Sequence, residues 1–500
     1  MLDDTTALSV GSRSPRPWLA ALLSFAFPGL GQAYAGRPRE ALLFAVPVIL
    51  LAVAVVVLVS DATGDANRLF APAFLTFVMI LNAGLLLWRL AAIAHAGLVA
   101  AGRLVGRHRR MATGTVVGLV VLSVGMHAWV GMVVVQLEAT LAQVFAPDPG
   151  QLPIPDPSGQ PGGADPTPAP TEEPNRWAQG DPINLLLLGT DAAPGRETTQ
   201  PDVILVLSVD PVDRSAVMVS VPRDTGWIPL PDDRIYPDGL YPRKVNQLAA
   251  EAAASPQRWC PDHAVPDPDR CGRESLERSI GLYLGIEIHH YAAVDMAGFA
   301  EMIDAVGGLE LCLPGRLVDP EFDGSLENRG EGEPLILPAG CHHYSGLEAL
   351  AYARSRQGWI ESADGARQNQ TDFDRNERQQ NVLLALRREL AQADTLFELP
   401  GLLSAIGRTV TTDVPREQAG DMAGLLPLIT GPDIDRVVLG HPEFVDLPVE
   451  PEVNYLLVPK RDAVREAMAE HFGRDELLGW YLATRTPAAP AAPLDEPAQR

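Results

Sequence analysis

The sequence predicts an α/β protein with two parts, a multi-span helical membrane anchor followed by an α/β/α domain with a central mixed β-sheet. Long uncharged apolar runs recur within residues 1–145, which we interpret as the membrane region. A spacer rich in Pro, Gly, Asp and Thr covers 146–180 and cannot build a core. Over 181–475, short branched apolar runs alternate with helical patterns, as in layered α/β domains. Residues 486–500 predict a disordered tail.

Three apolar runs predict transmembrane helices, because about 20 helical residues cross a bilayer. A signal peptide would instead be one short apolar stretch with a cleavage site. The runs cover residues 41–60, 69–88 and 114–135. Basic residues collect on the cytoplasmic side of membrane proteins, and arginines precede the first run and recur at 103–110. This pattern predicts a cytoplasmic N-terminus and places everything after residue 136 outside a multi-pass anchor.

The apolar stretch 18–36 precedes these runs but is broken by Pro28–Gly29 and by Gly31. If it crossed the membrane, the arginines at 37–39 would lie on the outer side, against the usual distribution of positive charge. We therefore expect a re-entrant or interfacial hairpin here, and a fourth span is the alternative.

Charge is distributed unevenly along the 500-residue chain, whose net charge is −24. Residues 1–145 hold ten basic and six acidic side chains, whereas the remainder holds 29 basic and 57 acidic ones. A domain this acidic repels nucleic acid, which proteins normally contact with basic surfaces. Nearly all basic residues are Arg, a bias that a GC-rich genome also produces, so arginine content alone indicates no function.

The four cysteines all lie after the membrane region. An even number confined to one part of the chain is typical of disulfides in an oxidising compartment. Cys260 and Cys271 flank a loop rich in Pro and Asp and form the first expected pair, and Cys312 and Cys341 form the second. The spacings do not fit a paired CxxC zinc site. Four reduced, buried thiols are the alternative.

Polar residues stand at the ends of the expected strands, where layered α/β proteins usually bind ligands. Asp191 follows the first strand, Asp202 opens the second, and Arg223 follows the third. The strands are expected at 183–189, 202–209, 216–222, 289–294 and 309–314. Helices are expected at 245–254, 274–284, 298–306 and 376–392.

The segment 352–380, YARSRQGWIESADGARQNQTDFDRNERQQ, concentrates arginines within the acidic domain. If residues 352–356 are extended, Arg354 and Arg356 point to the same face, because side chains alternate along a strand. A solvated surface or convergence on one anion would both explain such a pair.

A helix is expected after this loop, with Asp372 as its N-cap. On that helix Arg375 and Gln379 are four residues apart and continue into a leucine stripe, so both face the core. An inward Arg needs either an acidic partner or an anionic ligand. Pairing with a nearby carboxylate is the simpler interpretation for any single arginine, and Arg378 is the clearest such case.

Convergence becomes the stronger hypothesis when four arginines are considered together. Arg223, Arg354, Arg356 and Arg375 all map to strand ends or to an inward helix terminus. Guanidinium groups match phosphate oxygens in geometry and charge. Several of them would suit a pyrophosphate.

The order and spacing of short motifs resemble the LytR-CpsA-Psr family of cell-wall enzymes over residues 183–475. The motifs are LLLLGTD, PDVILVLSVDP, SVPRDT, KVN, HHYAAVDMAGFAEMIDAVGGLELCLP, LEALAYARSR and DFDRNERQQ. The resemblance implies an extracytoplasmic, Mg²⁺-dependent transferase anchored in the cell membrane. Its donor would be a polyprenyl-pyrophosphate-linked glycopolymer, its acceptor a peptidoglycan hydroxyl, and its product a phosphodiester.

The resemblance also implies roles for the residues that match the family motifs. The candidate catalytic residues are Arg223, Arg375 and Asp372. The residues expected to bind the pyrophosphate are Arg223, Arg354, Arg356, Arg375 and Gln379. Asp191 and Asp202 are the expected ligands of Mg²⁺, and either Asp202 or Asp372 would take the acceptor proton.

One position departs from the family pattern. The family usually has Arg two residues before the second metal-binding Asp, and this chain has Gln200, with Arg196 close by as a substitute.

Three other functions stay open. The domain could hydrolyse polyprenyl pyrophosphate, or bind a lipid-linked glycan without turnover, which Gln200 favours. A transcriptional regulator is the third, and the acidic outer domain argues against it.

Overall fold

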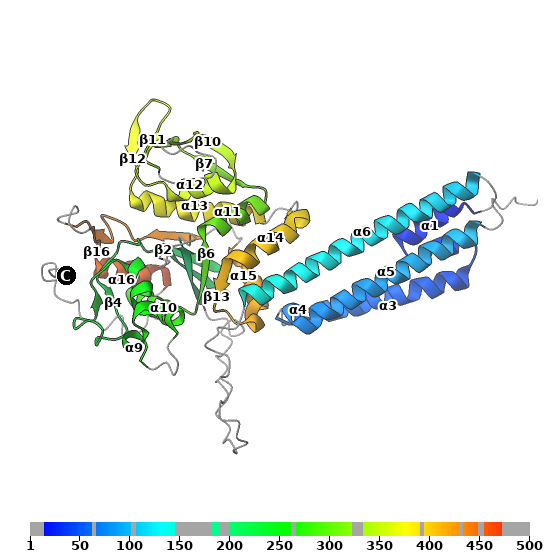
Figure 1. Cartoon of the computed structure of the whole chain (residues 1–500), viewed down its shortest axis with the longest axis horizontal. Helices are drawn as coiled ribbons and strands as arrows, with labels where there is room; N and C mark the ends of the chain where they lie inside the picture. The colour runs from blue at the N-terminus through cyan, green and yellow to red at the C-terminus, as the bar shows by residue number, and fades with distance from the viewer. Residues whose placement is uncertain are drawn as a thin grey trace, which may run out of the picture. The chain divides into compact units, whose positions relative to one another are not determined.

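The computed structural model describes residues 15–62, 67–101, 107–145, 182–190, 200–261, 267–322, 334–390, 395–429, 434–448 and 455–472. The chain divides into two compact units, Met1–Ala139 and Thr140–Arg500 (Figure 1). The expected linker 146–180, the expected tail 486–500 and Asp191 lie outside the described residues.

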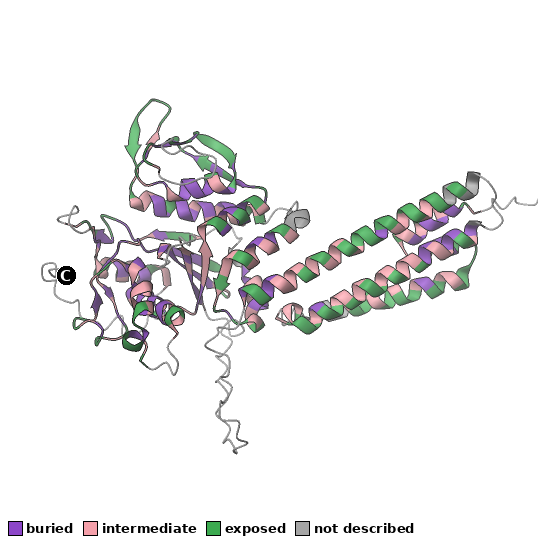
Figure 2. Ribbon diagram, viewed as in Figure 1, coloured by how far each residue is buried: buried purple, intermediate pink, exposed green. Residues whose placement is uncertain are grey.

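Three of the N-terminal helices are long and apolar enough to cross a membrane, which matches the three expected spans. Their sides carry large apolar residues in exposed positions, such as Leu50 (64% exposed), Ile80 (68%) and Leu87 (69%) (Figure 2). Such exposure suits contact with lipid. The helices before residue 145 are α1 (Pro17–Ala26), α2 (Leu30–Tyr34), α3 (Pro38–Ala62), α4 (Asn67–Phe70), α5 (Pro72–Ala101) and α6 (Arg107–Val144).

The interrupted stretch 18–36 forms a hairpin of two short helices, α1 and α2. Gly29, at φ +103°, makes the turn, and buried Gln32 accepts a hydrogen bond from Ser24 (2.9 Å) and donates one to the carbonyl of Ala92 on α5 (3.0 Å). Ten residues of α1 span only about 15 Å, half the hydrocarbon core. By its length, α1 alone is therefore too short to span the hydrocarbon core.

The C-terminal α/β domain has a central mixed sheet with strand order β13-β6-β1-β2-β3-β14. The pairs β1–β6 and β3–β14 are parallel, and the other three pairs are antiparallel. The bounds are β1 (Ile183–Thr190), β2 (Pro201–Asp210), β3 (Ser215–Ser220), β6 (His290–Asp295), β13 (Val410–Thr412) and β14 (Asp435–Val438).

Helices cover both faces of this sheet, which confirms the α/β/α expectation (Figure 1). Because side chains alternate along strands, Leu186 packs with α8, α10 and α16, whereas Leu185 packs with α13 and α15. The helices are η2 (Val245–Gln247), α8 (Leu248–Ala254), α9 (Pro256–Trp259), α10 (Pro268–Leu284), α11 (Met296–Ala305), α12 (Gly346–Arg354), α13 (Asp372–Leu390), α14 (Thr395–Thr409), η3 (Arg416–Gln418), α15 (Ala419–Ile429) and α16 (Arg461–Phe472).

Smaller sheets complete the domain and carry one disulfide. The expected strand at 309–314 forms as β7 but pairs with β10 rather than with the central sheet. Cys312 and Cys341 are directly opposite in that pair and are bonded, and Cys260 is bonded to Cys271, so both expected disulfides form. The remaining strands are β4 (Ile228–Pro229), β5 (Leu240–Tyr241), β7 (Leu309–Leu313), β8 (Arg316–Asp319), β9 (Leu335–Leu337), β10 (Gly340–Tyr344), β11 (Trp359–Glu361), β12 (Arg367–Asn369), β15 (Val445–Asp446) and β16 (Val458–Pro459).

Candidate functional site: a cavity lined by four arginines

The antiparallel order β1-β2-β3 brings two of the candidate residues to one edge of the sheet. Thr190 at the end of β1 pairs with Pro201 at the start of β2, and Ser220 at the end of β3 pairs with Leu205. Asp202 and Arg223 therefore meet, and an ion pair joins Arg223 Nη1 to Asp202 Oδ1. The sheet topology thus explains why residues 21 positions apart in sequence share a site.

Residues 352–356 do not form the extended strand considered from the sequence, because residues 352–354 are helical and Arg356 lies beyond the helix end. Helix α12 begins with a capping box in which the Ser345 and Glu348 side chains bond to each other's backbone N–H, and it ends at Arg354. Arg356 lies in the turn that follows. The two arginines reach the same cavity because the chain leaves the helix between them, not because strand side chains alternate.

Helix α13 supplies the third element, with a different cap from the one expected. Thr371 Oγ1 accepts from the N–H of Asp374 (3.3 Å), and the Asp374 carboxylate accepts from the N–H of Thr371 (2.6 Å). Asp372 is instead the first helical residue, and its carboxylate is free to contact arginines. Arg375 (2% exposed) and Gln379 (8% exposed) are buried, as their inward position predicts.

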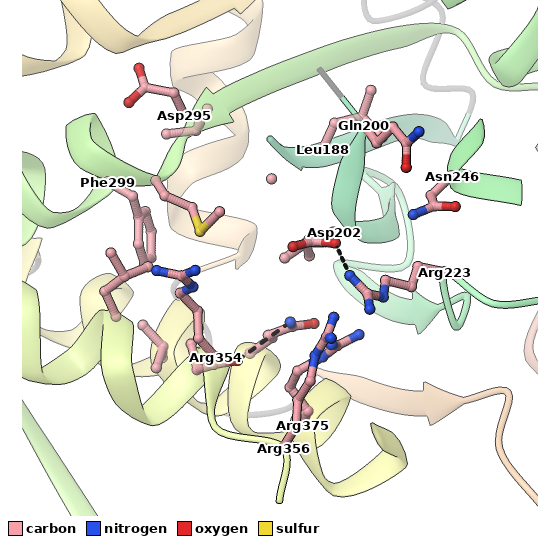
Figure 3. Close-up of a pocket in the computed structure, with 18 of the residues that line it drawn as sticks. Leu188, Gln200, Asp202, Arg223, Asn246, Asp295, Phe299, Arg354, Arg356 and Arg375 are labelled. Carbon is pink, nitrogen blue, oxygen red and sulfur yellow. Dashed lines mark hydrogen bonds and ion pairs between the residues drawn. The ribbon is translucent and has the colours of Figure 1, made fainter. Parts of the chain in front are cut away.

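These elements enclose a cavity of about 650 Å³. Its lining includes every described residue that the sequence assigned to the anion, namely Arg223, Arg354, Arg356, Arg375 and Gln379, together with Asp202. Figure 3 shows the guanidinium groups of Arg223, Arg356 and Arg375 turned toward one another, with Arg354 across the cavity beside Phe299. The expected convergence is therefore present in the described part of the chain.

Asp372 pairs with two of these arginines. Arg375 Nη2 lies 2.9 Å from Asp372 Oδ2, and Arg356 Nε lies 3.8 Å from Asp372 Oδ1. Burial lowers the pKa of Arg375 to about 10, and the neighbouring charges of Arg356 and Arg223 act in the same direction while Asp372 opposes them. A bound anion would raise the pKa of Arg375 again, because it would stabilise the charged guanidinium.

Arg223 is better compensated than Arg375. Burial alone would lower its pKa, but the carboxylates of Asp202, Asp224 and Asp372 outweigh that effect and hold its pKa above the usual value. Asp224 is itself bound by Lys244 Nζ at 2.8 Å. Arg223 therefore stays charged at any physiological pH and can bind an anion.

Arg378 does not belong to the cavity lining, and it does not pair with a carboxylate as expected. Its guanidinium is buried and donates to the backbone carbonyls of Tyr352 (2.9 Å) and Ser355, and to Gln370 Oε1 (2.7 Å). Burial lowers its pKa. These acceptors lie in the last turn of α12, directly after α12 and just before α13, so Arg378 joins the two helices.

Several cavity residues were not predicted from the sequence. Asn246, at 5% exposure, lines the cavity, and its Oδ1 has no hydrogen-bond partner among the described residues. Gln200 lies close by on the same side as Asp202 (Figure 3). The KVN motif contained the signal for Asn246. The cavity is also lined by apolar side chains, which include Met296, Phe299, Phe322, Leu350, Val382 and Leu383.

The fit of a magnesium ion depends on few protein ligands. Among the described residues, no group of three or more His, Cys, Asp or Glu side chains could hold a metal. Asp202 lines the cavity, whereas its expected partner Asp191 lies outside the described residues. Mg²⁺ often takes only one or two carboxylates and completes its shell with phosphate oxygens and water. Asp202, one of the carboxylates that line the cavity, therefore fits an ion that binds together with a phosphate ligand.

The chain is similar in sequence to several curated proteins. It is 28% identical over 236 residues to the polyisoprenyl-teichoic acid–peptidoglycan teichoic acid transferase TagU of Halalkalibacterium halodurans, covering 47% of this chain and 62% of that protein. It is 31% identical over 235 residues to the regulatory protein MsrR of Staphylococcus aureus, covering 47% and 57%. It thus spans less than two thirds of each relative.

A third relative, the transferase TagV of Bacillus subtilis, is 24% identical over 294 residues, covering 58% of this chain and 64% of that protein. The crystal structure of TagV aligns with 58% of this chain and 97% of its own, with a TM-score of 0.41. The LytR_cpsA_psr family profile matches residues 163–438, which is more than half of the chain and contains the arginine-lined cavity. The chain belongs to the LytR_cpsA_psr family.

Proposed function

We propose that the outer domain is a phosphotransferase that moves an anionic glycopolymer from a polyprenyl-diphosphate carrier to a hydroxyl of peptidoglycan. The observation that carries the proposal is the convergence of Arg223, Arg354, Arg356 and Arg375 on one cavity that also has an apolar wall. Two relatives bear the name of teichoic acid transferases, which supports the same class of reaction.

The arginines and the apolar side chains of the cavity match the two parts of such a donor, its diphosphate and its prenyl chain. Guanidinium groups pair with phosphate oxygens through charge-assisted hydrogen bonds, and several of them suit a diphosphate. The apolar side chains that line the cavity, such as Phe299 and Leu350, suit a prenyl chain, because burying apolar surface is favourable. A polyprenyl diphosphate, with a charged diphosphate and a hydrocarbon chain, would therefore suit both the arginines and the apolar side chains.

The proposed reaction is an in-line displacement at phosphorus. The acceptor oxygen forms a bond to the phosphorus next to the glycan, the bridging P–O bond breaks, and polyprenyl phosphate leaves with the electron pair. Arg375 and its neighbours stabilise the charge that develops on the leaving phosphate. We propose that the hydroxyl proton passes to Asp202, which lines the cavity, or to Asp372, which lies beside Arg375 and Arg356.

We propose Mg²⁺ as the cofactor, with Asp202 as its ligand in the described part of the chain. When bound, the ion would neutralise charge on the phosphate oxygens. Because Asp202 also pairs with Arg223, replacing Asp202 should weaken both metal and donor binding.

The membrane helices support a topology with the catalytic domain outside. Three helices can span the membrane, and the basic residues of the N-terminal part favour a cytoplasmic N-terminus. We propose that these helices hold the enzyme where lipid-linked donors and the cell wall meet. A reporter fused to the C-terminus should be accessible from outside intact cells, and a cytoplasmic signal would reject this topology.

The decisive experiment uses the full chain in lipid nanodiscs with Mg²⁺, lipid-linked teichoic acid and peptidoglycan. Mass spectrometry should find glycopolymer joined to peptidoglycan by a phosphodiester. Release of free polyprenyl phosphate without a conjugate would instead favour hydrolysis of the diphosphate. Donor binding without any product would favour a binding or regulatory role, which the neutral Gln200 in the cavity would explain.

A further inference from the structure

One buried carboxylate holds the turn between the two arginines that follow α12. Ser355, fully buried between Arg354 and Arg356, donates its hydroxyl to Asp319 Oδ2 at 2.7 Å. The backbone N–H groups of Arg356 and Gln357 donate to the same oxygen at 3.1 and 3.4 Å. A single oxygen therefore fixes three consecutive residues, including the backbone from which Arg356 extends.

Asp319 has no evident role in binding the anion directly. It ends strand β8 and is only 2% exposed, and its other oxygen accepts the N–H of Glu321 at 3.2 Å. No Lys, Arg or His of the described residues forms an ion pair with it. A buried carboxylate is costly unless hydrogen-bonded, and a negative charge in the wall of this cavity opposes a bound phosphate. Its contribution must therefore be geometric.

The carbonyl side of the same turn is held from α13. Arg378 donates to the carbonyls of Tyr352 and Ser355, and Gln379 Nε2 donates to the carbonyl of Ala353 at 3.5 Å. These groups lie where α12 ends, so several of its carbonyls lack partners within the helix. Asp319 from the N–H side and α13 from the C=O side together fix the backbone of the turn.

We propose that Asp319 is a positioning residue for the arginine pair, and that it sets the affinity for a diphosphate by fixing the turn that begins directly after Arg354 and carries Arg356. The proposal rests on the function proposed above. Misplacement of a binding group by about 1 Å can lower activity roughly 100-fold. Asp319 therefore acts through Arg354 and Arg356 and never needs to touch the ligand.

The test measures binding of farnesyl diphosphate to the full chain in nanodiscs by calorimetry. Asp319→Ala should weaken binding roughly 10- to 100-fold. Asp319→Asn keeps one acceptor oxygen for the turn and should retain most of the affinity. If the negative charge of Asp319 were itself required, this variant would bind as weakly as Asp319→Ala. Asp304→Ala is the matched control, because Asp304 binds the N–H of Gly346 (2.7 Å) at the other end of α12. It should bind as the wild type does.

A double-mutant cycle separates positioning from general damage. In a chain that already carries Arg354→Ala and Arg356→Ala, Asp319→Ala should have no further effect. An equal loss in both backgrounds would overturn the proposal, and so would wild-type binding by Asp319→Ala. If that variant does not fold, Ser355→Ala removes only one donor and should show a smaller loss with the same dependence on the arginines. Failure of the wild type to bind the probe would reject the diphosphate site itself.

Discussion

Two buried arginines lie one turn apart on helix α13, and the regions around them differ in what the protein offers to each guanidinium. Arg378 is surrounded by acceptors, since it donates to two backbone carbonyls and one side-chain amide. Arg375 has one carboxylate partner, Asp372, and its Nε has no hydrogen-bond partner among the described residues. Other arginines point toward it (Figure 3).

The difference teaches that burial of an arginine does not by itself indicate a ligand. Burial lowers the pKa of both side chains, but only at Arg375 do neighbouring arginines lower it further. Arg378 is a structural group, because each of its three guanidinium nitrogens donates a hydrogen bond to the protein. Arg375 is one of several cations whose charges the protein leaves partly unbalanced, which is the condition under which an anion binds well.

The largest expected effect is the loss of activity in Arg375→Ala. Removing one group that stabilises developing charge typically costs about 10²- to 10³-fold in rate, and we expect a loss of that size in the transfer assay. The same substitution in Arg354 should also abolish transfer. Folding should survive, because the change removes a poorly compensated buried charge. Near-normal transfer by Arg375→Ala would show that Arg375 has no role in the reaction, contrary to the comparison with Arg378.

Arg378→Ala should show the reverse pattern, with a loss of stability of about 3 kcal/mol, because it leaves the buried carbonyls of Tyr352 and Ser355 unpaired. Thermal unfolding followed by tryptophan fluorescence would measure it. Arg388→Ala, an exposed position on the same helix, is the control and should change little. If Arg375→Ala destabilised the domain as much as Arg378→Ala, the two regions would not differ as described.

The sequence was sufficient to predict which residues meet but not how the chain brings them together. The ends of the first two strands and the inward spacing of Arg375 and Gln379 are local patterns, and they predicted that Asp202, Arg375 and Gln379 line one cavity. The helical form of residues 352–354 was missed, although Ser345 and Glu348 carry a capping-box signal.

The supports of the site could not be predicted from the sequence. Arg378 and Asp319 bind backbone groups, and any residue type supplies a backbone N–H or carbonyl. Only the fold brings β8 and α13 against the turn after α12, so neither side chain has a sequence pattern that would reveal its partners. The cap of α13 is a different case, because Thr371 and Asp374 form a local capping box three residues apart, a pattern present in the sequence that was passed over in favour of Asp372.

A smaller effect is expected from Arg356→Lys. The Arg356 side chain is 38% exposed and lies 3.8 Å from Asp372, so it is the least constrained cation of this group with a carboxylate nearby. Lys keeps the charge but loses the planar fork that binds two phosphate oxygens. We expect about tenfold weaker transfer, mainly through a higher KM for the donor. Arg316→Lys, in a surface pair with Glu361, is the matched control and should leave transfer unchanged.

The smallest effect concerns Glu277 on α10, a carboxyl outside the cavity. Burial raises its pKa to about 8, and Asp413 and Glu274 act in the same direction. The folded chain therefore keeps a proton that the unfolded chain, with a pKa of 4.5, releases. Stability should fall as pH rises between these values.

Glu277→Gln should remove that pH dependence, raising Tm at pH 8 by roughly 2–4 °C with no change below pH 4.5. Transfer activity should not change, because a proton rather than a ligand neutralises this group. Tm measured across the pH range for both chains provides the check. Parallel Tm curves would show that Glu277 is already compensated in the fold. A loss of transfer in Glu277→Gln would show that a buried titratable group outside the cavity also matters for function, and the contrast between Arg375 and Arg378 would then need a different explanation.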